Sequence, residues 1–204
     1  AYATGDALTA LAATINSATS LTVESWFTDT SGSGVQKVFM AGNSSSSYID
    51  VTPNKSGSNS QEIKTSATSE IDNRGSPVTA VQWYIAANWN STTNLMTLYS
   101  GQVGGTLNTV QTSMGGDLLS SISVQSFMFG GSTFADPDMA GTIAEARLWT
   151  GTFSLSDAST NFAAGPNATL TAAPEPAALG MFGFALMGLG YIRYRRSVVD
   201  CSAI

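Results

Sequence analysis

Two carboxylates with a spacing suited to catalysis lie at Glu70 and Asp72. Residues i and i+2 of a β-strand point to the same face, so on a strand these side chains would be neighbours. Paired carboxylates are what glycoside hydrolysis needs, one acting as an acid and the other as a nucleophile. However, Arg74 occupies the position where a third acid would continue the pattern, and Gly75 and Pro77 follow it. We therefore expect a polar loop with scattered charge here.

A second acidic group, Asp136-Pro137-Asp138, could contribute to a metal site. Calcium takes about six to eight oxygen ligands, usually from several carboxylates and carbonyls, and Asp136 and Asp138 would supply two of them. The same tripeptide is equally typical of a plain turn, because Asp and Pro both favour turn conformations. Asp50 and Asp117 are weaker candidates. Calcium bound by Asp136 and Asp138 is therefore one hypothesis beside a structural turn.

Three aromatic residues could stack on a sugar ring. Trp89 follows Asn88 at the end of a predicted strand, and Tyr48 and Tyr99 are candidate companions. Aromatic side chains often line the sites that hold small ligands. Large aromatic residues are also mostly buried, so core packing is the simpler expectation for each ring.

Missing residue types exclude several classes of site. The 204 residues include no histidine, which removes Ser-His-Asp triads, Cys-His pairs and His-ligated metals. Cys201 is the single thiol, so the chain can form neither a disulfide framework nor a four-thiolate zinc site. The net charge is −6, and the first 173 residues hold five basic and twelve acidic residues. Without a basic patch there, we do not expect nucleic-acid binding.

Short segments with strand character, separated by Gly, Ser, Asn and Pro, make up residues 1–165. We identify no long helical periodicity, and expect one short helix at Leu155–Phe162 with Ser154 or Ser156 as its cap. About nine strands over this length predict an all-β fold, an antiparallel two-sheet jelly-roll sandwich. The predicted strands are Leu21–Phe27, Val35–Met40, Tyr48–Val51, Gln61–Thr65, Val81–Asn88, Leu95–Ser100, Leu107–Thr112, Ser123–Phe129 and Thr142–Trp149.

The C-terminal end has a different character. Residues 166–173 form a small-residue linker, and Ala177–Ile192 is an uncharged apolar run followed by an arginine cluster. Sixteen residues in a helix span roughly 24 Å, somewhat less than a bilayer core of ~30 Å. We expect one transmembrane-type helix here, with the arginines on the cytoplasmic side and the body outside.

Three successive features of this end, in residues 174–196, resemble the PEP-CTERM sorting signal of bacterial envelope proteins: a Pro-Glu-Pro tripeptide, a short apolar helix and a basic cluster. The resemblance implies recognition by an exosortase in the inner membrane, with processing near the tripeptide. It also implies export, anchoring through the C-terminus, and delivery to the cell surface or an extracellular matrix. A short tail, 197–204, departs from the pattern. The residues that carry the resemblance are Pro174, Glu175, Pro176, Arg193, Arg195 and Arg196.

Because Ala1 is not a methionine and no export signal precedes the body, we expect a mature N-terminus or a fragment.

Ordered segments of the body resemble a LamG-like, concanavalin A-type jelly roll. Leu21–Phe27 is similar to the first inner strand of that family, which ends in an aromatic pair. Gln82–Asn88 resembles its central tryptophan strand, and Phe129–Gly131 followed by Ala140–Trp149 resembles its closing pattern. Concanavalin A-like glucanases use an E-x-D-x-E strand, which Arg74 interrupts here. The resemblance therefore implies a binding module and not a glycosidase.

The leading hypothesis is an exported, non-catalytic bacterial surface protein whose module binds a ligand, with polysaccharide as the candidate. The alternative is a structural building block that self-associates into a filament or biofilm matrix. Both follow from the sandwich joined to a sorting tail, and they differ in whether the partner is a glycan or a second copy.

Overall fold

The computed structural model describes residues 6–31, 36–55, 60–66, 68–73, 79–132 and 136–168; for residues 6–8 and 69–73 it describes the backbone alone. The contact pattern divides the chain after Asn167, and the described residues apart from Ala168 belong to the first unit. The sorting tail, with Pro174–Pro176, Ala177–Ile192 and the three arginines, lies outside the described residues. None of the helices within the described ranges has the length and apolar character needed to span a membrane.

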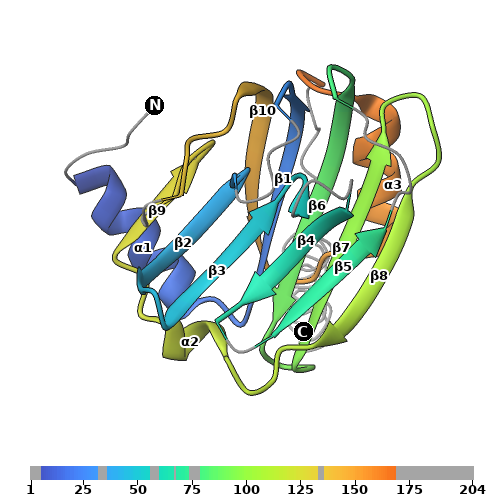
Figure 1. Ribbon diagram of the computed structural model, residues 1–204. Coiled ribbons are helices and arrows are strands. Elements are labelled where there is room, and N and C mark those ends of the chain that lie inside the picture. The colour runs from blue at the N-terminus through green and yellow to red at the C-terminus, as the bar shows by residue number, and fades with distance from the viewer. Residues whose placement is uncertain are drawn as a thin grey trace, which may run out of the picture. The chain divides into compact units, whose positions relative to one another are not determined.

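Two five-stranded antiparallel sheets lie face to face (Figure 1). Sheet A has the order β10-β1-β6-β7-β8, and sheet B has the order β5-β4-β3-β2-β9. The predicted two-sheet sandwich is therefore confirmed. The strands are β1 Ser20–Asp29, β2 Phe39–Ser44, β3 Ser47–Thr52, β4 Ser60–Thr65, β5 Ser69–Asn73, β6 Gln82–Asn90, β7 Leu95–Gln102, β8 Asn108–Ser113, β9 Ser126–Phe129 and β10 Gly141–Thr150.

Three elements were not expected, and the short helix α2, Leu119–Ile122, is one of them. Asp6–Ser17 forms helix α1, although we identified no helical periodicity there. Leu11, Ala12 and Ile15 repeat at the helical spacing and bury one face of α1 against the core. Ser69–Asn73 forms strand β5, where we expected a polar loop. Pairing of its backbone with β4 outweighs its polar composition.

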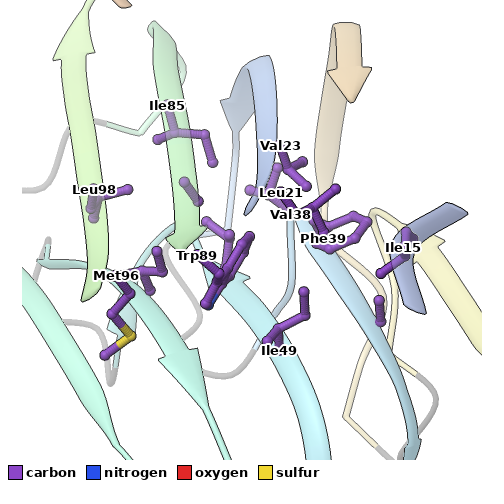
Figure 2. Packing of buried hydrophobic residues seen from close by; sticks show 14 of the residues in the cluster. Ile15, Leu21, Val23, Val38, Phe39, Ile49, Ile85, Trp89, Met96 and Leu98 are labelled. Atoms are coloured by element: carbon purple, nitrogen blue, oxygen red, sulfur yellow. The ribbon is translucent and has the colours of Figure 1, made fainter. Parts of the chain in front are cut away.

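The space between the sheets is filled by the main hydrophobic core. Figure 2 shows Trp89 of β6 near the middle of this layer, between side chains of both sheets. Trp89 is fully buried, and its ring centroid lies 6.4 Å from that of Phe39 on β2. Truncating a large buried aromatic residue costs about 3–5 kcal/mol, so this layer supplies much of the stability. Side chains of α1 and of the short helix α2, Leu119–Ile122, extend the same core.

A second hydrophobic cluster covers the outer face of sheet A. Helix α3, Leu155–Ala164, confirms the predicted helix, and Ser154 is its cap. Ala158 and Phe162 of α3 pack on the outer cluster of Trp26 and Tyr84. Neighbouring aromatics of β6 consequently serve different layers: Trp83 points between the sheets and Tyr84 points under α3.

Candidate functional site

The three aromatic residues predicted to bind a sugar lie in three different layers. Trp89 is in the core between the sheets, where it has no solvent-exposed face, and its indole N–H donates to the Lys64 carbonyl at 3.3 Å. Tyr99 is on the outer face of sheet A, with its ring centroid 6.1 Å from that of Phe153. Tyr48 is on the outer face of sheet B, because the next residue, Ile49, points into the core. The structure therefore does not bring the three rings together.

The acids predicted to bind calcium lie in the loop between β9 and β10. Asp136 is half-buried and its Oδ2 accepts a hydrogen bond from Ser132 Oγ at 3.2 Å. Asp138 is exposed. Within the described ranges, no group of three or more His, Cys, Asp or Glu residues is placed to hold a metal ion. Calcium at Asp136 and Asp138 stays a prediction, now without a described third carboxylate to support it.

Glu70 and Asp72 lie on the edge strand β5, opposite Ile63 and Gln61 of β4. Arg74 lies outside the described residues. The two acids occupy positions i and i+2 of one strand, as the catalytic hypothesis required. The side chains of Glu70 and Asp72 lie outside the described part of the structure.

A polar cluster that our sequence reasoning did not assemble lies on the outer face of sheet B. Ile49 and Val51 of β3 and Ile63 of β4 point into the core, so the residues between them point outward. Two further lysines, one before β2 and one after β3, reach the same face. All three lysines of the chain thus meet on one sheet face. We call this cluster the lysine face; it consists of Lys37, Lys55, Lys64, Tyr48, Asp50, Thr52 and Glu62.

Two of these lysines form ion pairs with buried carboxylates. Lys37 Nζ lies 3.0 Å from Asp50 Oδ2 and donates to Thr52 Oγ1 at 3.1 Å. Lys55 Nζ lies 2.6 Å from Glu62 Oε1. The Asp50 side chain is 1% exposed and that of Glu62 is 6% exposed. A buried carboxylate is costly unless it is paired, so each lysine has a clear electrostatic role.

Asp50 is the least satisfied member of the lysine face. Burial raises the pKa of its carboxyl group, and the nearby Lys37 ammonium opposes that shift. The second oxygen, Oδ1, is buried and has no hydrogen-bond donor among the residues that the structure describes. Such an oxygen calls for an explanation, because nearly all buried polar atoms in proteins are paired. A hydroxyl group or a water molecule at this position would satisfy it.

Lys64 and Tyr48 form the remaining part of the face, where Lys64 is half-buried and Tyr48 is 8% exposed. Lys64 Nζ lies 5.5 Å from the centroid of the Tyr48 ring. The pKa of Lys64 is raised, first by its hydrogen bonding with Tyr48 and further by Asp50 and Glu62, so its ammonium group stays charged at neutral pH. An aromatic ring beside a cation and carboxylates offers both a stacking surface and charged hydrogen-bonding groups. The signal that could have found this site is that all three lysines of an otherwise acidic chain fall within residues 37–64.

Glu24 anchors a second buried polar network, under α3. Its side chain is fully buried in β1, and Oε1 accepts from Tyr84 Oη at 2.5 Å and from Asn161 Nδ2 at 2.9 Å. Oε2 accepts from Trp149 Nε1. Burial and the Glu24 charge raise the pKa of Tyr84 well above its usual range. Because both carboxylate oxygens are satisfied, this network is a structural anchor for α3.

The C-terminal end matches a known protein-sorting motif. Residues 172–196 match the PEP-CTERM protein-sorting motif, which confirms the sequence resemblance at this end. A chain with this motif is an exported substrate of exosortase-type sorting. No curated protein matches this chain.

Several solved structures with a similar fold are sialidases or modules of sialidases. A CBM40 module of a Ruminococcus gnavus sialidase, bound to α2,3-sialyllactose, is 15% identical with a TM-score of 0.58, covering 70% of this chain and 82% of that one. The leech intramolecular trans-sialidase is 16% identical with a TM-score of 0.59, covering 75% of this chain and 24% of that one. At such identities the likeness shows the fold alone. The body thus shares the β-sandwich of sialidase carbohydrate-binding modules, while a specifically LamG-like identity is not shown.

Proposed function

We propose that this chain is a non-catalytic carbohydrate-binding module, exported to the bacterial surface or an extracellular matrix, with its binding site on the lysine face. The single observation that carries the proposal is the buried Asp50 Oδ1, which lies in the carboxylate paired with Lys37 and has no donor within the described part of the chain. Because the Asp50 side chain is only 1% exposed, we expect the side chains that cover it to move aside, so that a sugar hydroxyl donates to this oxygen and accepts from a neighbouring ammonium group. The fold shared with sialidase carbohydrate-binding modules supports the same conclusion.

The charge of the face favours a carboxylated sugar. Three ammonium groups meet two carboxylates on the described lysine face, whereas the whole chain has a net charge of −6. Concentrated positive charge on an acidic protein attracts an anionic ligand to one place. Tyr48 is 8% exposed, so the small exposed part of its side chain would contact the sugar while the half-buried Lys64 contacts the sugar carboxylate. A solved CBM40 module with the same fold is bound to α2,3-sialyllactose, a carboxylated glycan.

The proposed partners follow from the sorting motif and the site. An exosortase in the inner membrane would process the chain near Pro174–Pro176, after export of the body. Catalysis is not proposed, because histidine is absent from the sequence and the E-x-D pair at Glu70 and Asp72 lacks a third acid in the strand pattern. Calcium at Asp136 and Asp138 would be a structural ion of the β9–β10 loop.

The test measures binding of carboxylated and neutral sugars by isothermal titration calorimetry. The probes are α2,3-sialyllactose, an oligogalacturonate and, as the neutral match, lactose. We expect a carboxylated probe to bind and lactose to bind at least about tenfold more weakly, which corresponds to about 1.4 kcal/mol. Lys64→Gln should lower affinity for the carboxylated probe by a similar factor, and Lys64→Arg should retain most of it.

Equal binding of the neutral and carboxylated probes, or full affinity in Lys64→Gln, would contradict the proposed site. Repeating the titration with EDTA separates the calcium hypothesis from the site itself. If EDTA abolishes binding and added calcium restores it, the result would support calcium binding by Asp136 and Asp138. If EDTA leaves the titration unchanged, calcium is not needed for glycan binding.

A further inference from the structure

The four edge strands of the sandwich differ in how well they are protected from pairing with another strand. Sheet A ends at β8 and β10, and sheet B ends at β5 and β9. An edge strand presents unpaired backbone N–H and C=O groups, and proteins usually protect it with charges, short length or a covering element. Comparing the four edge strands therefore shows at which edge a strand from another molecule could join the sheet.

Three edges have such protection. Glu145 and Arg147 on β10 form an ion pair at 2.7 Å, and the backbone N–H of Asn167 also donates to Glu145. Strand β9 has four residues and lies beside α1, whose Asn16 bonds both backbone groups of Val124 just before the strand. Strand β5 has five residues, of which two are acidic.

Strand β8 has none of these features. Its six residues, Asn108–Ser113, include no charged residue and no proline. Val110 is half-buried and packs against the core, while Asn108, Thr109, Gln111 and Ser113 are exposed. Figure 1 shows β8 as the outermost strand of sheet A, on the side of the sandwich away from α1. Among the described residues, β7 is the one strand with which β8 pairs.

We propose that β8 pairs antiparallel with β8 of a second copy of this chain. The pairing would join the two five-stranded A sheets into one continuous sheet across a two-fold axis. About half of the backbone groups of an edge strand point away from its single neighbour, so they would form the new hydrogen bonds. The proposal does not depend on glycan binding, because the lysine face lies on sheet B.

Charge identifies the second copy as the occupant. Two copies of a chain with net charge −6 repel each other. They can approach most easily through a surface that has no charged side chains. An uncharged strand permits self-pairing, with Thr, Asn, Gln and Ser side chains facing their counterparts. A basic partner would instead match an acidic edge such as β5. The exposed side chains of β8 are all polar and neutral, which fits a copy of itself best.

The expected dimer is weak. Pairing of two six-residue strands buries less than the roughly 1,200 Å² typical of stable interfaces. Association should therefore appear at high protein concentration, as on a crowded cell surface, and the measurement must cover that range.

Disulfide trapping locates the contact. The full chain in detergent, with Cys201→Ser to remove the native thiol, receives one new cysteine: Gln111→Cys on β8 or, as the control, Thr92→Cys in the exposed β6–β7 turn. Under mild oxidation we expect at least about tenfold more covalent dimer from Gln111→Cys. Equal dimer yields from the two variants would overturn the proposal.

Added charge tests the same contact without a cross-link. Thr109→Lys with Gln111→Lys places two ammonium groups on the β8 edge, and Thr92→Lys with Thr152→Lys makes the same charge change at exposed positions elsewhere. Sedimentation velocity should show loss of dimer in the first variant and an unchanged dimer in the second, with circular dichroism confirming that both fold. Dimer retained in the β8 variant, or a wild-type chain that stays monomeric at every concentration, would contradict the proposal. A chain that dimerises but binds none of the sugar probes would contradict the glycan site on the lysine face and would leave the β8 pairing supported.

Discussion

Glu24 shows how one buried carboxylate connects three strands and a helix. Its two oxygens accept hydrogen bonds from Tyr84 on β6, Trp149 on β10 and Asn161 on α3. Replacing it with alanine leaves three donors under α3 without their acceptor. Each unsatisfied buried group costs about 1–3 kcal/mol, so Glu24→Ala should lower the free energy of unfolding by about 3 kcal/mol or more. Urea unfolding followed by tryptophan fluorescence measures the change.

Glu145→Ala is the matched control for this prediction. It removes a carboxylate of the adjacent strand β10 that is paired with Arg147 but 24% exposed. A partly exposed pair is worth about 1 kcal/mol or less, so the control should be much milder than Glu24→Ala. Similar small losses in both variants would mean that water replaces the Glu24 carboxylate, and that the network does not anchor α3.

The sequence predicted residue types better than residue partners. Tyr48 was a predicted ligand-binding residue and lies on the lysine face, but Trp89 and Tyr99 lie in other layers. Alternation along a strand shows which residues share a face, but not which sheet that face belongs to. The ion pairs of Lys37 with Asp50 and of Lys55 with Glu62 join residues from different strands or loops, and such pairings depend on sheet order.

Helix α3 provides a test at the level of a single element. Ser154 and Asp157 form a capping box: Ser154 Oγ accepts from the Asp157 N–H at 3.3 Å, and Asp157 Oδ2 accepts from the Ser154 N–H at 2.7 Å. Ser154→Ala removes one half of this exchange and should lower the unfolding free energy by about 0.5–2 kcal/mol.

Ser156→Ala controls for the loss of a hydroxyl group inside the same helix. Ser156 was the other candidate cap, yet it lies in the first turn and is exposed. We expect a change within about 0.5 kcal/mol for this variant. The capping role fails if thermal unfolding ranks Ser156→Ala as the more damaging of the two.

Most strands were predictable because hydrophobic alternation and turn residues are local signals. Strands β1, β3, β4, β6, β7 and β10 lie close to the predicted ranges, whereas β2 begins later than predicted, at Phe39. Strand β5 was not predicted, because its polar residues belong to a strand only through pairing with β4. Helix α1 was missed although its apolar residues repeat at helical spacing, since the small residues around them resemble those of loops.

At the scale of the whole molecule, we propose that the sorting motif determines where the chain acts. The positive-inside rule predicts that the cluster Arg193, Arg195 and Arg196 stays on the cytoplasmic side of the membrane. Replacing all three with Glu should reduce membrane retention of the chain in its native cells to a minor fraction, measured by fractionation and protease accessibility. The triple Lys variant keeps the charge and should behave like the natural chain. Unchanged localisation of the Glu variant would contradict the anchoring role.

The lysine face is the central claim, and backbone NMR shifts during a sugar titration test it most directly. We predict that α2,3-sialyllactose or the oligogalacturonate shifts the amide signals of Tyr48–Thr52 and Glu62–Thr65, while lactose at the same concentration leaves them nearly unchanged. Shifts confined to the β9–β10 loop or to α3, or the absence of shifts with either carboxylated probe, would contradict a glycan site on the outer face of sheet B.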